Sequence, residues 1–600
     1  MMKKLLLLSF IMLMPWLARA QYYHETFVPD TKNPDIVMCY QGFSYSEDRN
    51  SWITINGIPF DMWVEYSIYL TENKAVLFNL FEFDGLKHDG VFEIPNHIHY
   101  NGVDYPVTEV IKIGQSNLKT VICPETVTVF GKVQLAGNQG LQSVILKGVK
   151  TIKAGAFMDC SFNIEIPPCV EYIGSSAFKG CTGIKDVSLE HVECIRREAF
   201  TDSSLKNLSL GFAKQIESNA FTNADSLESV SIAEFGADLL PEKAFYRCDR
   251  LRYVSLGEGL KEIGWRAFAG CKSIEEVSLP QSLTTIGEEV FFDNEEKGKI
   301  CSALKKVNFP DNLKNIGDKA FFYTGIEELA LPEGLTDLGR YAFSHTPLKS
   351  VRLPESLTYI PDGGFTVTLL QEVNIPVTCT SIGNSAFACC HSLEAIELPV
   401  GLKEIGSYAF EQCENLKEII FPEGLEDIGD SPFWGDYALE SVSFPTTIKK
   451  VRRFGHINGI KDIYCHAYFD APILFDIHSP NKDITLHVPH DLMLQFHDSV
   501  PWCYFRIVDL EKGEPYPDDD SEDIGVAEIP HRSTRISAEG GTLRMEGCEP
   551  GDMITVCDLA GRQLLKAKAN DTTAIIATSL SRGETAVLRI AGRHFKVMMR

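Results

Sequence analysis

One stretch decides the fold of this chain: residues 251–271, which read LRYVSLGEGLKEIGWRAFAGC. Val254 and Leu256 stand two residues apart, so both face the same side of an extended strand. Ile263 belongs to a second short apolar stretch, and Phe268 is placed to fill an interior. A unit of this size cannot bury its own apolar face, so it needs neighbours of the same kind.

Two residue types mark the bends of the unit. Gly264 follows the second apolar stretch, where we expect the chain to bend sharply. In other units a proline follows the first strand, and proline ends a strand because it cannot donate to the hydrogen-bond ladder. These prolines are Pro280, Pro332, Pro354, Pro399 and Pro422.

The dipeptide Ala-Phe recurs along the chain, mostly every 21 to 24 residues. Degenerate copies at Phe291, Phe365 and Phe433 bring the series to thirteen units, and a polar insertion at 293–299 should loop out of one of them. We predict that the repeated phenylalanines form the scaffold of the repeat: Phe157, Phe178, Phe200, Phe221, Phe245, Phe268, Phe321, Phe343, Phe387 and Phe410.

Stacked units of this kind form a solenoid with a continuous core. The predicted fold is therefore mainly β: a repeat solenoid of about thirteen coils, with an N-terminal β cap and a small C-terminal β-sandwich-like domain. Helical content should be low, because each unit has room only for a turn or a short 3₁₀ segment around Ala-Phe.

The repeat closely resembles the BspA-like leucine-rich repeat family, over residues 106–510. Known members are surface or secreted proteins, many from Bacteroidetes, and some bind host matrix proteins or other bacteria. The resemblance implies recognition of a protein or cell-surface macromolecule. It does not transfer a ligand, so the ligand-binding residues stay unknown at this stage.

The segments around the array differ from it in pattern. Residues 21–105 carry alternating, aromatic-rich stretches that predict a β cap. We expect residues 91–95 and 105–107 to form a hairpin around the turn Asn101-Gly102. Trp502 and Phe505 resemble the closing segment of the family and should cover the last coil. The acidic, proline-containing stretch 511–523 reads as a solvated linker, with calcium binding as the alternative.

Residues 524–600 form a small β domain by pattern, with a strand, turn and strand around Ile554 and Leu564. This domain resembles the C-terminal sorting domain of the type IX secretion system of Bacteroidetes. The matching residues are Asp558, Gly561, Arg562, Gly583, the strand 587–590 and Lys596-Val597. The family often has Gly-Ile-Tyr where this chain has Gly583-Glu584-Thr585, so sorting and a purely structural role both stay open.

The N-terminus predicts export. A basic start, a short apolar run and a small-x-small site at 18–20 are typical of a signal peptide cleaved between Ala20 and Gln21. We therefore expect a secreted or outer-surface protein with no integral membrane segment after signal removal. The formal charge of −26 argues against nucleic acid and anionic lipid as partners, because both require basic surfaces.

Six cysteines occupy one slot, three residues after the repeat phenylalanine, where Ser203 and Ala224 stand in other units. A slot shared by such residues favours small, buried thiols, and disulfides between neighbouring coils are the alternative. The six are Cys160, Cys181, Cys248, Cys271, Cys390 and Cys413.

No catalytic motif stands out, and we predict neither an enzyme nor a bound cofactor or metal. A metal site could be drawn from His487, His490 and His497, but their spacing fits no helix-based motif and surface or cap histidines are the alternative. The same region also contains His466 and His478. Carboxylate pairs such as Glu275-Glu276 recur at equivalent repeat positions and read as a solvated face.

The leading hypothesis is a recognition or adhesion protein that binds through the exposed face of the array. A structural or self-associating envelope protein is the first alternative. A glycan-binding module that uses the N-terminal aromatic residues Trp52, Trp63 and Tyr66 is the second.

Overall fold

The stretch 251–271 folds as one coil of a parallel β-solenoid. Strand β22 (Tyr253–Glu258) buries Val254 and Leu256 and leaves Tyr253 on the outside. Strand β23 (Glu262–Ile263) buries Ile263, and the turn that follows carries the buried Phe268. The predicted strand, bend and interior phenylalanine are therefore confirmed within one unit.

The computed structural model divides into two units, residues 1–392 and 393–600. It describes residues 22–30, 32–33, 35–44, 54–55, 58–59, 62–82, 90–113, 118–131, 135, 140–292, 303–455, 459–466, 474–475, 482–498 and 502–516, and the strands between 535 and 598. The predicted signal peptide with Ala20 and Gln21, the insertion 293–299 and the acidic run 518–523 lie outside these residues.

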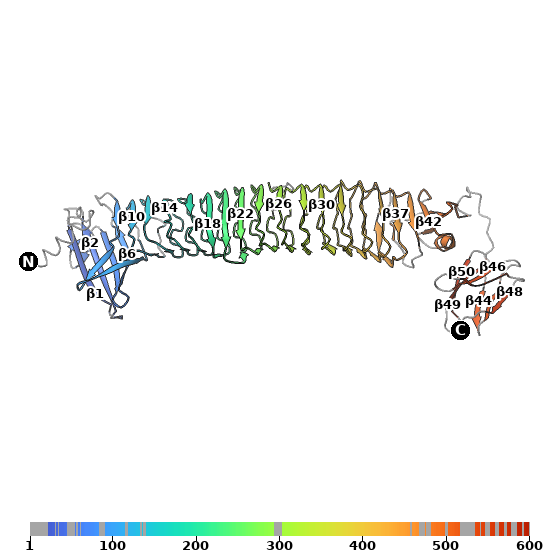
Figure 1. Cartoon of the computed structure of the whole chain (residues 1–600), viewed down its shortest axis with the longest axis horizontal. Helices are drawn as coiled ribbons and strands as arrows, with labels where there is room; N and C mark the ends of the chain where they lie inside the picture. Colours follow the sequence, from blue (N-terminus) through green and yellow to red (C-terminus); the bar gives the residue numbers. More distant parts are fainter. Residues whose placement is uncertain are drawn as a thin grey trace, which may run out of the picture. The chain divides into compact units, whose positions relative to one another are not determined.

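Parallel strands line one side of the coils in the first unit, and Figure 1 shows them in succession from β10 to β30. They form three sheets. The first contains β7 (Val91–Glu93), β10 (Thr120–Cys123), β12 (Ser143–Leu146) and β14 (Asn163–Glu165). The second contains β16 (Asp186–Ser188), β18 (Asn207–Ala213), β20 (Ser229–Phe235), β22, β24 (Glu276–Ser278) and β26 (Lys306–Asn308). The third contains β28 (Glu328–Ala330), β30 (Ser350–Arg352) and β32 (Glu372–Asn374).

Proline follows most of the three-residue strands on this side of the coils, β16 excepted. Where Pro280, Pro332 or Pro354 follows, the strand is three residues long and ends two residues before the proline. Strands β18 and β20, without that proline, are seven residues long. The missing N–H of proline ends the ladder, as the sequence predicted.

Short two-residue strands form a second side of each coil. One group is β11 (Val129–Phe130), β13 (Thr151–Ile152), β15 (Tyr172–Ile173), β17 (Cys194–Ile195) and β19 (Gln215–Ile216). Another is β21 (Leu239–Leu240), β23, β25 (Thr285–Ile286), β27 (Asn315–Ile316) and β29 (Asp337–Leu338). Strands β31 (Tyr359–Ile360) and β33 (Ser381–Ile382) continue the pattern.

The N-terminal strands are joined directly to the solenoid. Strands β1 (Tyr22–Pro29), β2 (Ile36–Ser44), β5 (Met62–Tyr69) and β6 (Lys74–Glu82) pair antiparallel in that order. Strand β6 then pairs in parallel with β9 (Val103–Val110), and β9 pairs with β11 of the first coils. The antiparallel strands thus cover the edge that the solenoid would otherwise expose. A separate hairpin joins β3 (Thr54–Ile55) and β4 (Ile58–Pro59).

The predicted turn at Asn101-Gly102 is present between β8 (His97–Tyr100) and β9, with positive φ at both residues. The stretch 91–93 differs from the expectation, which placed it with this hairpin. It is β7, and it pairs in parallel with β10. The parallel sheet therefore begins inside the region that the sequence assigned to the cap.

The third side of the coil is a turn that forms its own hydrogen-bond ladder. In the Phe268 coil, the N–H groups of Arg266, Phe268 and Gly270 donate to carbonyls of the next coil at 3.1, 3.0 and 2.9 Å. Arg266 and Gly270 have positive φ, and the N–H groups of Ala267 and Ala269 donate to carbonyls within their own coil. Other coils repeat this pattern, so each buried turn N–H finds a partner despite its irregular backbone.

The repeat phenylalanines stack on one another inside the coils. Consecutive rings from Phe130 to Phe387 in the first unit lie 5.0–6.0 Å apart between centroids and are nearly parallel. In the second unit Phe410 stacks on Phe433 at 5.5 Å. All ten predicted scaffold phenylalanines are at most 1% exposed, which fits the interior role predicted for them. Phe130 extends the stack beyond the Ala-Phe series.

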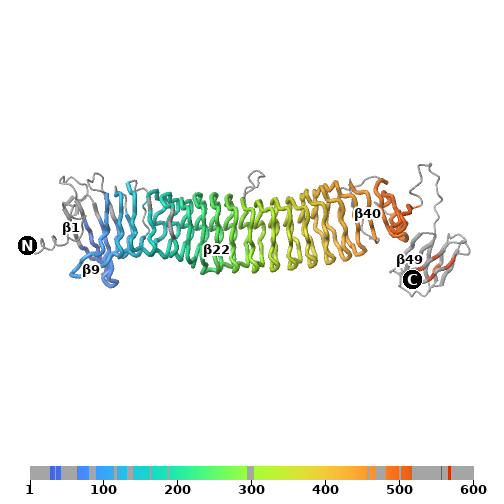
Figure 2. Tube along the Cα trace, turned by 45° about the horizontal axis from the view of Figure 1, so that its top comes forward, coloured from blue at the N-terminus to red at the C-terminus, as the bar shows by residue number. Residues whose placement is uncertain are grey.

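Gly264 is required by the neighbouring coil rather than by its own backbone angles. An added Cβ would come within 2.9 Å of the Leu240 carbonyl oxygen. The same holds at Gly317 and Gly339, where the nearest backbone atom would be 2.6 and 2.3 Å away. At this slot adjacent coils therefore lie too close for a side chain, and Figure 2 shows the close spacing of the trace through this part of the first unit.

The second unit continues the repeat pattern. One sheet contains β35 (Glu418–Ile420), β37 (Ser441–Phe444), β40 (Asp462–Cys465), β42 (Thr485–Val488) and β43 (Arg506–Asp509). The short strands are β34 (Glu404–Ile405), β36 (Asp427–Ile428), β38 (Lys450–Val451), β39 (Arg453–Gly455) and β41 (Leu474–Phe475).

A small helical segment packs near the end of this sheet, formed by η2 (His490–Leu492), α2 (Met493–His497) and η3 (Trp502–Tyr504). Trp502 and Phe505 are buried, and Trp502 meets Phe496 edge-on at 5.2 Å. The predicted closing role of Trp502 and Phe505 thus agrees with their burial. Within the described ranges, no helix is both long and apolar enough to cross a membrane.

The last strands form two antiparallel sheets. One contains β44 (Arg535–Glu539), β45 (Thr542–Glu546) and β48 (Thr573–Ala577). The other contains β47 (Gln563–Lys568), β46 (Met553–Cys557), β49 (Thr585–Ile590) and β50 (Arg593–Met598). The strand–turn–strand predicted around Ile554 and Leu564 is the pair β46–β47. Asp558, Gly561, Arg562 and Gly583 lie outside the described residues.

Replacing Phe268 with alanine should destabilise the protein by about 3–5 kcal/mol, because the substitution leaves a cavity within the ring stack. Chemical denaturation followed by circular dichroism measures this loss. Tyr253→Ala is the matched control, since Tyr253 is 68% exposed on the same coil and should change stability by less than about 0.5 kcal/mol. Equal losses for both variants would contradict the proposed role of the stack.

Candidate binding surface

The strand side of the coils is flat and polar in the middle of the first unit. Ser231, Ser255 and Ser278 lie next to one another across β20, β22 and β24 and point outward. Because serine side chains are short, this row of the surface has few protrusions or hollows. Glu275 and Glu276 are exposed beside this row, as a solvated face predicts.

Ion pairs between neighbouring coils neutralise many of the surface lysines. Lys150 contacts Glu171 at 3.2 Å, and Lys261 contacts Asp238 at 2.8 Å. The same arrangement occurs at Lys179, Lys272, Lys349, Lys449 and Lys461. Exposed pairs of this kind stabilise a fold by only about 0–1 kcal/mol each. The positive charges of these lysines are therefore already balanced by carboxylates on the array itself.

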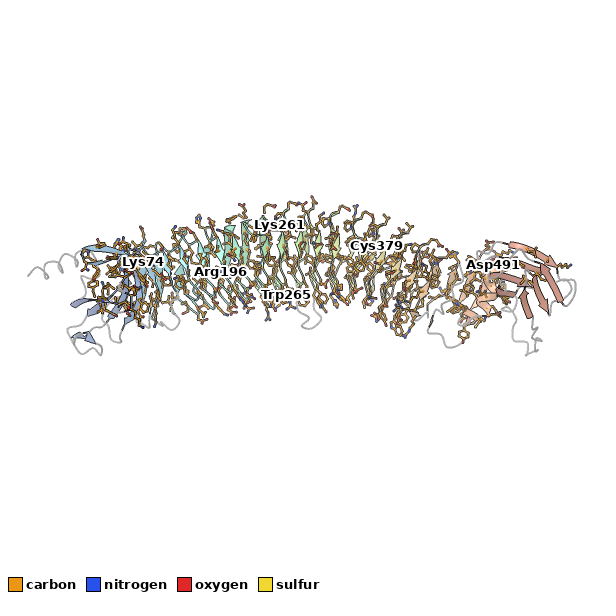
Figure 3. The ribbon with its side chains drawn as sticks, turned by 90° about the horizontal axis from the view of Figure 1, so that it is seen from below. Lys74, Arg196, Lys261, Trp265, Cys379 and Asp491 are labelled. Atoms are coloured by element: carbon orange, nitrogen blue, oxygen red, sulfur yellow. The ribbon has the colours of Figure 1, made fainter. Side chains whose placement is uncertain are left out.

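The turn side differs, because aromatic and basic side chains gather on it across consecutive coils. The turn geometry places them, since the residues just before and after Ala-Phe stand on the outer edge of each turn. We call this set the turn-face cluster: Lys243, Tyr246, Trp265, Arg266, Phe292, Lys319, Phe322, Tyr323 and His345. In Figure 3 its central residue Trp265 lies at the edge of the ribbon opposite Lys261.

Cations cover rings in the first half of the cluster. The Lys243 ammonium lies 4.6 Å from the centroid of Trp265 and 5.8 Å from that of Tyr246. The Arg266 guanidinium lies 4.8 Å from Trp265 and 5.6 Å from Phe292, and it also pairs with Glu289. These contacts hold the long basic side chains against a half-buried aromatic surface.

Aromatic rings contact one another in the second half. Phe292 stacks on Phe322 at 5.5 Å, and Phe322 meets Tyr323 edge-on at 4.8 Å. His345 lies 4.4 Å from Tyr323, and the Lys319 ammonium lies 5.7 Å from Phe322. Tryptophan, tyrosine and arginine are the residues most enriched at the energetic centres of protein interfaces. The cluster therefore has the composition of a binding surface on a rigid support.

The repeat is also recognised by comparison with known proteins. The family model described as a BspA-type leucine-rich repeat region matches six copies, over residues 114–228, 191–297, 214–346, 299–413 and 336–460. Together these matches span more than half of the chain. The chain belongs to the BspA-type leucine-rich repeat family.

The chain is also similar to several solved structures, at low sequence identity. A leucine-rich repeat protein from Bacteroides ovatus is 22% identical, with 68% of this chain and 98% of that chain covered and a TM-score of 0.43. A leucine-rich cell surface protein from Faecalibacterium prausnitzii is 20% identical, with 68% and 93% covered and a TM-score of 0.27. The pneumococcal vaccine antigen PcpA is 16% identical, with 81% and 97% covered and a TM-score of 0.29. No curated protein matches the chain.

The cysteine slot of the BspA-type repeat is buried, as predicted. Cys160, Cys181, Cys248, Cys271, Cys390 and Cys413 are all at most 6% exposed. The Cys248 and Cys271 thiols each donate to a phenylalanine carbonyl of the preceding coil at 3.1 Å. Burial raises the pKa of the Cys181 and Cys390 thiols to about 11, so both stay protonated and unreactive at neutral pH.

The late histidines have separate partners instead of one shared centre. His487 and His490 each lie 2.8 Å from a carboxylate, Asp462 and Asp509 respectively. His466 lies 3.2 Å from the Ser443 hydroxyl, and His497 lies 3.1 Å from Asp498. In the part of the chain that the structure describes, no group of three or more potential metal ligands is assembled. His478 lies outside that part.

The aromatic residues proposed for glycan binding are not shown to form a surface. Tyr66 is fully buried in β5, so its expected role as an exposed contact is wrong. Its side chain lies on the same face of β5 as the buried Val64 and Ile68, because residues two apart in a strand face the same side. Trp52 and the side chain of Trp63 lie outside the described residues.

Sequence reasoning missed the turn-face cluster. Its members are 20 or more residues apart in sequence from one coil to the next, and only the stacking brings them together. A usable signal was present, however. When the units are aligned on Ala-Phe, aromatic or basic residues flank the dipeptide in several consecutive units, at Lys243, Tyr246, Trp265, Arg266, Phe292 and Phe322.

One carboxylate occupies the slot that other coils fill with cysteine or threonine. Asp436 is 4% exposed, and its Oδ1 accepts the Cys413 N–H at 2.6 Å. Its Oδ2 has no hydrogen-bond partner within the described part of the chain. Burial, aided by the charges of Glu411 and Glu414, raises the pKa of Asp436 to about 8.

The raised pKa of Asp436 predicts a pH-dependent loss of stability. The unfolded carboxyl titrates near its ordinary value of 3.8, whereas the folded one holds its proton to about pH 8. The folded state thus binds more protons between these values, so stability should fall as pH rises through this window. Asp436→Thr should stabilise the protein at pH 8 by about 1–3 kcal/mol and flatten the slope.

Denaturation midpoints between pH 5 and pH 8.5 test this prediction. Asp311→Asn serves as the control, because it removes an exposed carboxylate and should leave the slope in place. A wild-type slope that persists unchanged in Asp436→Thr would show that another group is responsible.

Proposed function

We propose that this protein is a recognition or adhesion protein, which binds a protein or cell-surface macromolecule through the array. The observation that carries the proposal is the turn-face cluster. It presents half-buried aromatic rings and cations around the buried Phe322, on a backbone whose neighbouring turns are joined by hydrogen bonds. A rigid support favours binding, because little conformational freedom is lost when a partner docks.

We further propose that the chain acts outside the cell and is not an enzyme. Export is supported by the predicted signal peptide at 1–20, and sorting by the resemblance of 524–600 to type IX sorting domains. Each repeat uses its residues for strands, bends and the ring stack. Many of the lysines left on the surface are in ion pairs with carboxylates of a neighbouring coil.

Solid-phase binding of residues 21–600 to matrix proteins, mucins, polysaccharides and whole bacterial cells tests the proposal. We expect saturable binding to a protein or cell surface, weakened about tenfold or more by Trp265→Ala, since an interface hot spot contributes about 2 kcal/mol or more. Tyr253→Ala is the control, because it removes an exposed ring from the strand side of the same coil.

Two outcomes would contradict the proposal. If the protein associates with itself but binds nothing in the panel, the structural envelope protein would be favoured. Binding to polysaccharides alone would favour the glycan-binding module instead.

A further inference from the structure

Two lysines of the turn-face cluster lie over aromatic rings, unlike the array lysines that pair with carboxylates of a neighbouring coil. Lys243 contacts the rings of Trp265 and Tyr246, and Lys319 contacts the ring of Phe322. Neither ammonium has a carboxylate within ion-pair distance among the described residues. By contrast, Lys179 on a nearby turn pairs with Glu198 at 2.7 Å. The aromatic rings therefore hold these two charges in place without neutralising them.

The two lysines occupy the same position in their turns, immediately before Ala-Phe. Arg266 and Glu289 stand at this position in the two coils between them, and they pair with each other. Three coil spacings separate Lys243 from Lys319, which amounts to roughly 14 Å along the array at about 4.8 Å per coil. An extended polypeptide covers about 13 Å in four residues.

We propose that the turn-face cluster binds an extended, carboxylate-rich segment of a partner protein, which lies along the array with acidic side chains about four residues apart. This inference rests on the proposed function and specifies the chemistry of the partner. The acidic side chains would contact Lys243 and Lys319, and apolar side chains between them would lie against Trp265 and Phe292. Held cations favour such a contact, because the lysine side chains lose less freedom on binding.

The arrangement of the rings favours a protein segment over an anionic glycan. A sugar needs an open ring face for stacking, but two cations already lie over Trp265, and Phe292 and Phe322 stack on each other. Carboxylates on a peptide need only the ammonium groups and the ring edges. The overall charge of −26 also repels acidic partners elsewhere on the chain, so the cluster would be the place where such a segment docks.

Fluorescence anisotropy with residues 21–600 and a labelled random copolymer of glutamate and tyrosine tests this inference. We expect saturable binding that weakens with added salt, and about a tenfold or greater loss in the double variant Lys243→Gln with Lys319→Gln. The matched control is Lys261→Gln, which removes a lysine already paired with Asp238 and should change affinity less than about twofold. Thermal melting of each variant checks that the coils remain folded.

Three results would overturn the inference. The first is no binding of the copolymer, and the second is equal affinity for the double variant and the wild type. The third is tighter binding of hyaluronate or heparin than of the copolymer, with loss in the double variant, which would assign the cluster to an anionic glycan. If the double variant still binds a matrix protein or cell surface like wild type, this inference fails and the proposed function stands.

Discussion

The spacing between coils is the constraint on which the rest of the structure depends. Parallel strands repeat at about 4.8 Å, and each side of the coil must keep that spacing to retain its hydrogen bonds. The phenylalanine rings fill the interior at centroid distances of 5.0–6.0 Å, close to the strand spacing. Glycine is needed where the coils leave no room for a Cβ atom, because a side chain at Gly264 or Gly339 would collide with the preceding coil.

The same constraint arranges the surface. Because every coil is in register with the next, a residue type at one repeat position becomes a row along the array. Lysines and carboxylates in such rows neutralise each other, as Lys261 and Asp238 do. Rings and cations in such rows produce the turn-face cluster. The turn-face cluster therefore uses the same repeat positions as every other coil. It differs only in the aromatic and basic side chains that a few consecutive coils carry at those positions.

The sequence predicted the coil well because its signals are local. The spacing of Val254 and Leu256, the recurrent Ala-Phe and the strand-ending prolines each act within one unit. The parallel pairing of strand β7 with β10 was not predicted, because the unit that contains β7 lacks the Ala-Phe dipeptide. The left-handed residues of the turns escaped as well, because Glu198, Lys243 and Tyr341 adopt positive φ without the glycine or asparagine that usually signals it. Such residues are held there by hydrogen bonds to the next coil, which only the stacked structure supplies.

The turn ladder has a direction. Its N–H groups donate toward the C-terminal neighbour, from Gly155 to Val367 in the first unit, so the peptide dipoles of this side are aligned along the array. An α-helix aligns its dipoles in the same way and thereby acquires a partly positive and a partly negative end. The parallel strands contribute little to such a field. The solenoid therefore carries an electrical polarity along its turn side, and that side is where the aromatic rings and held cations lie.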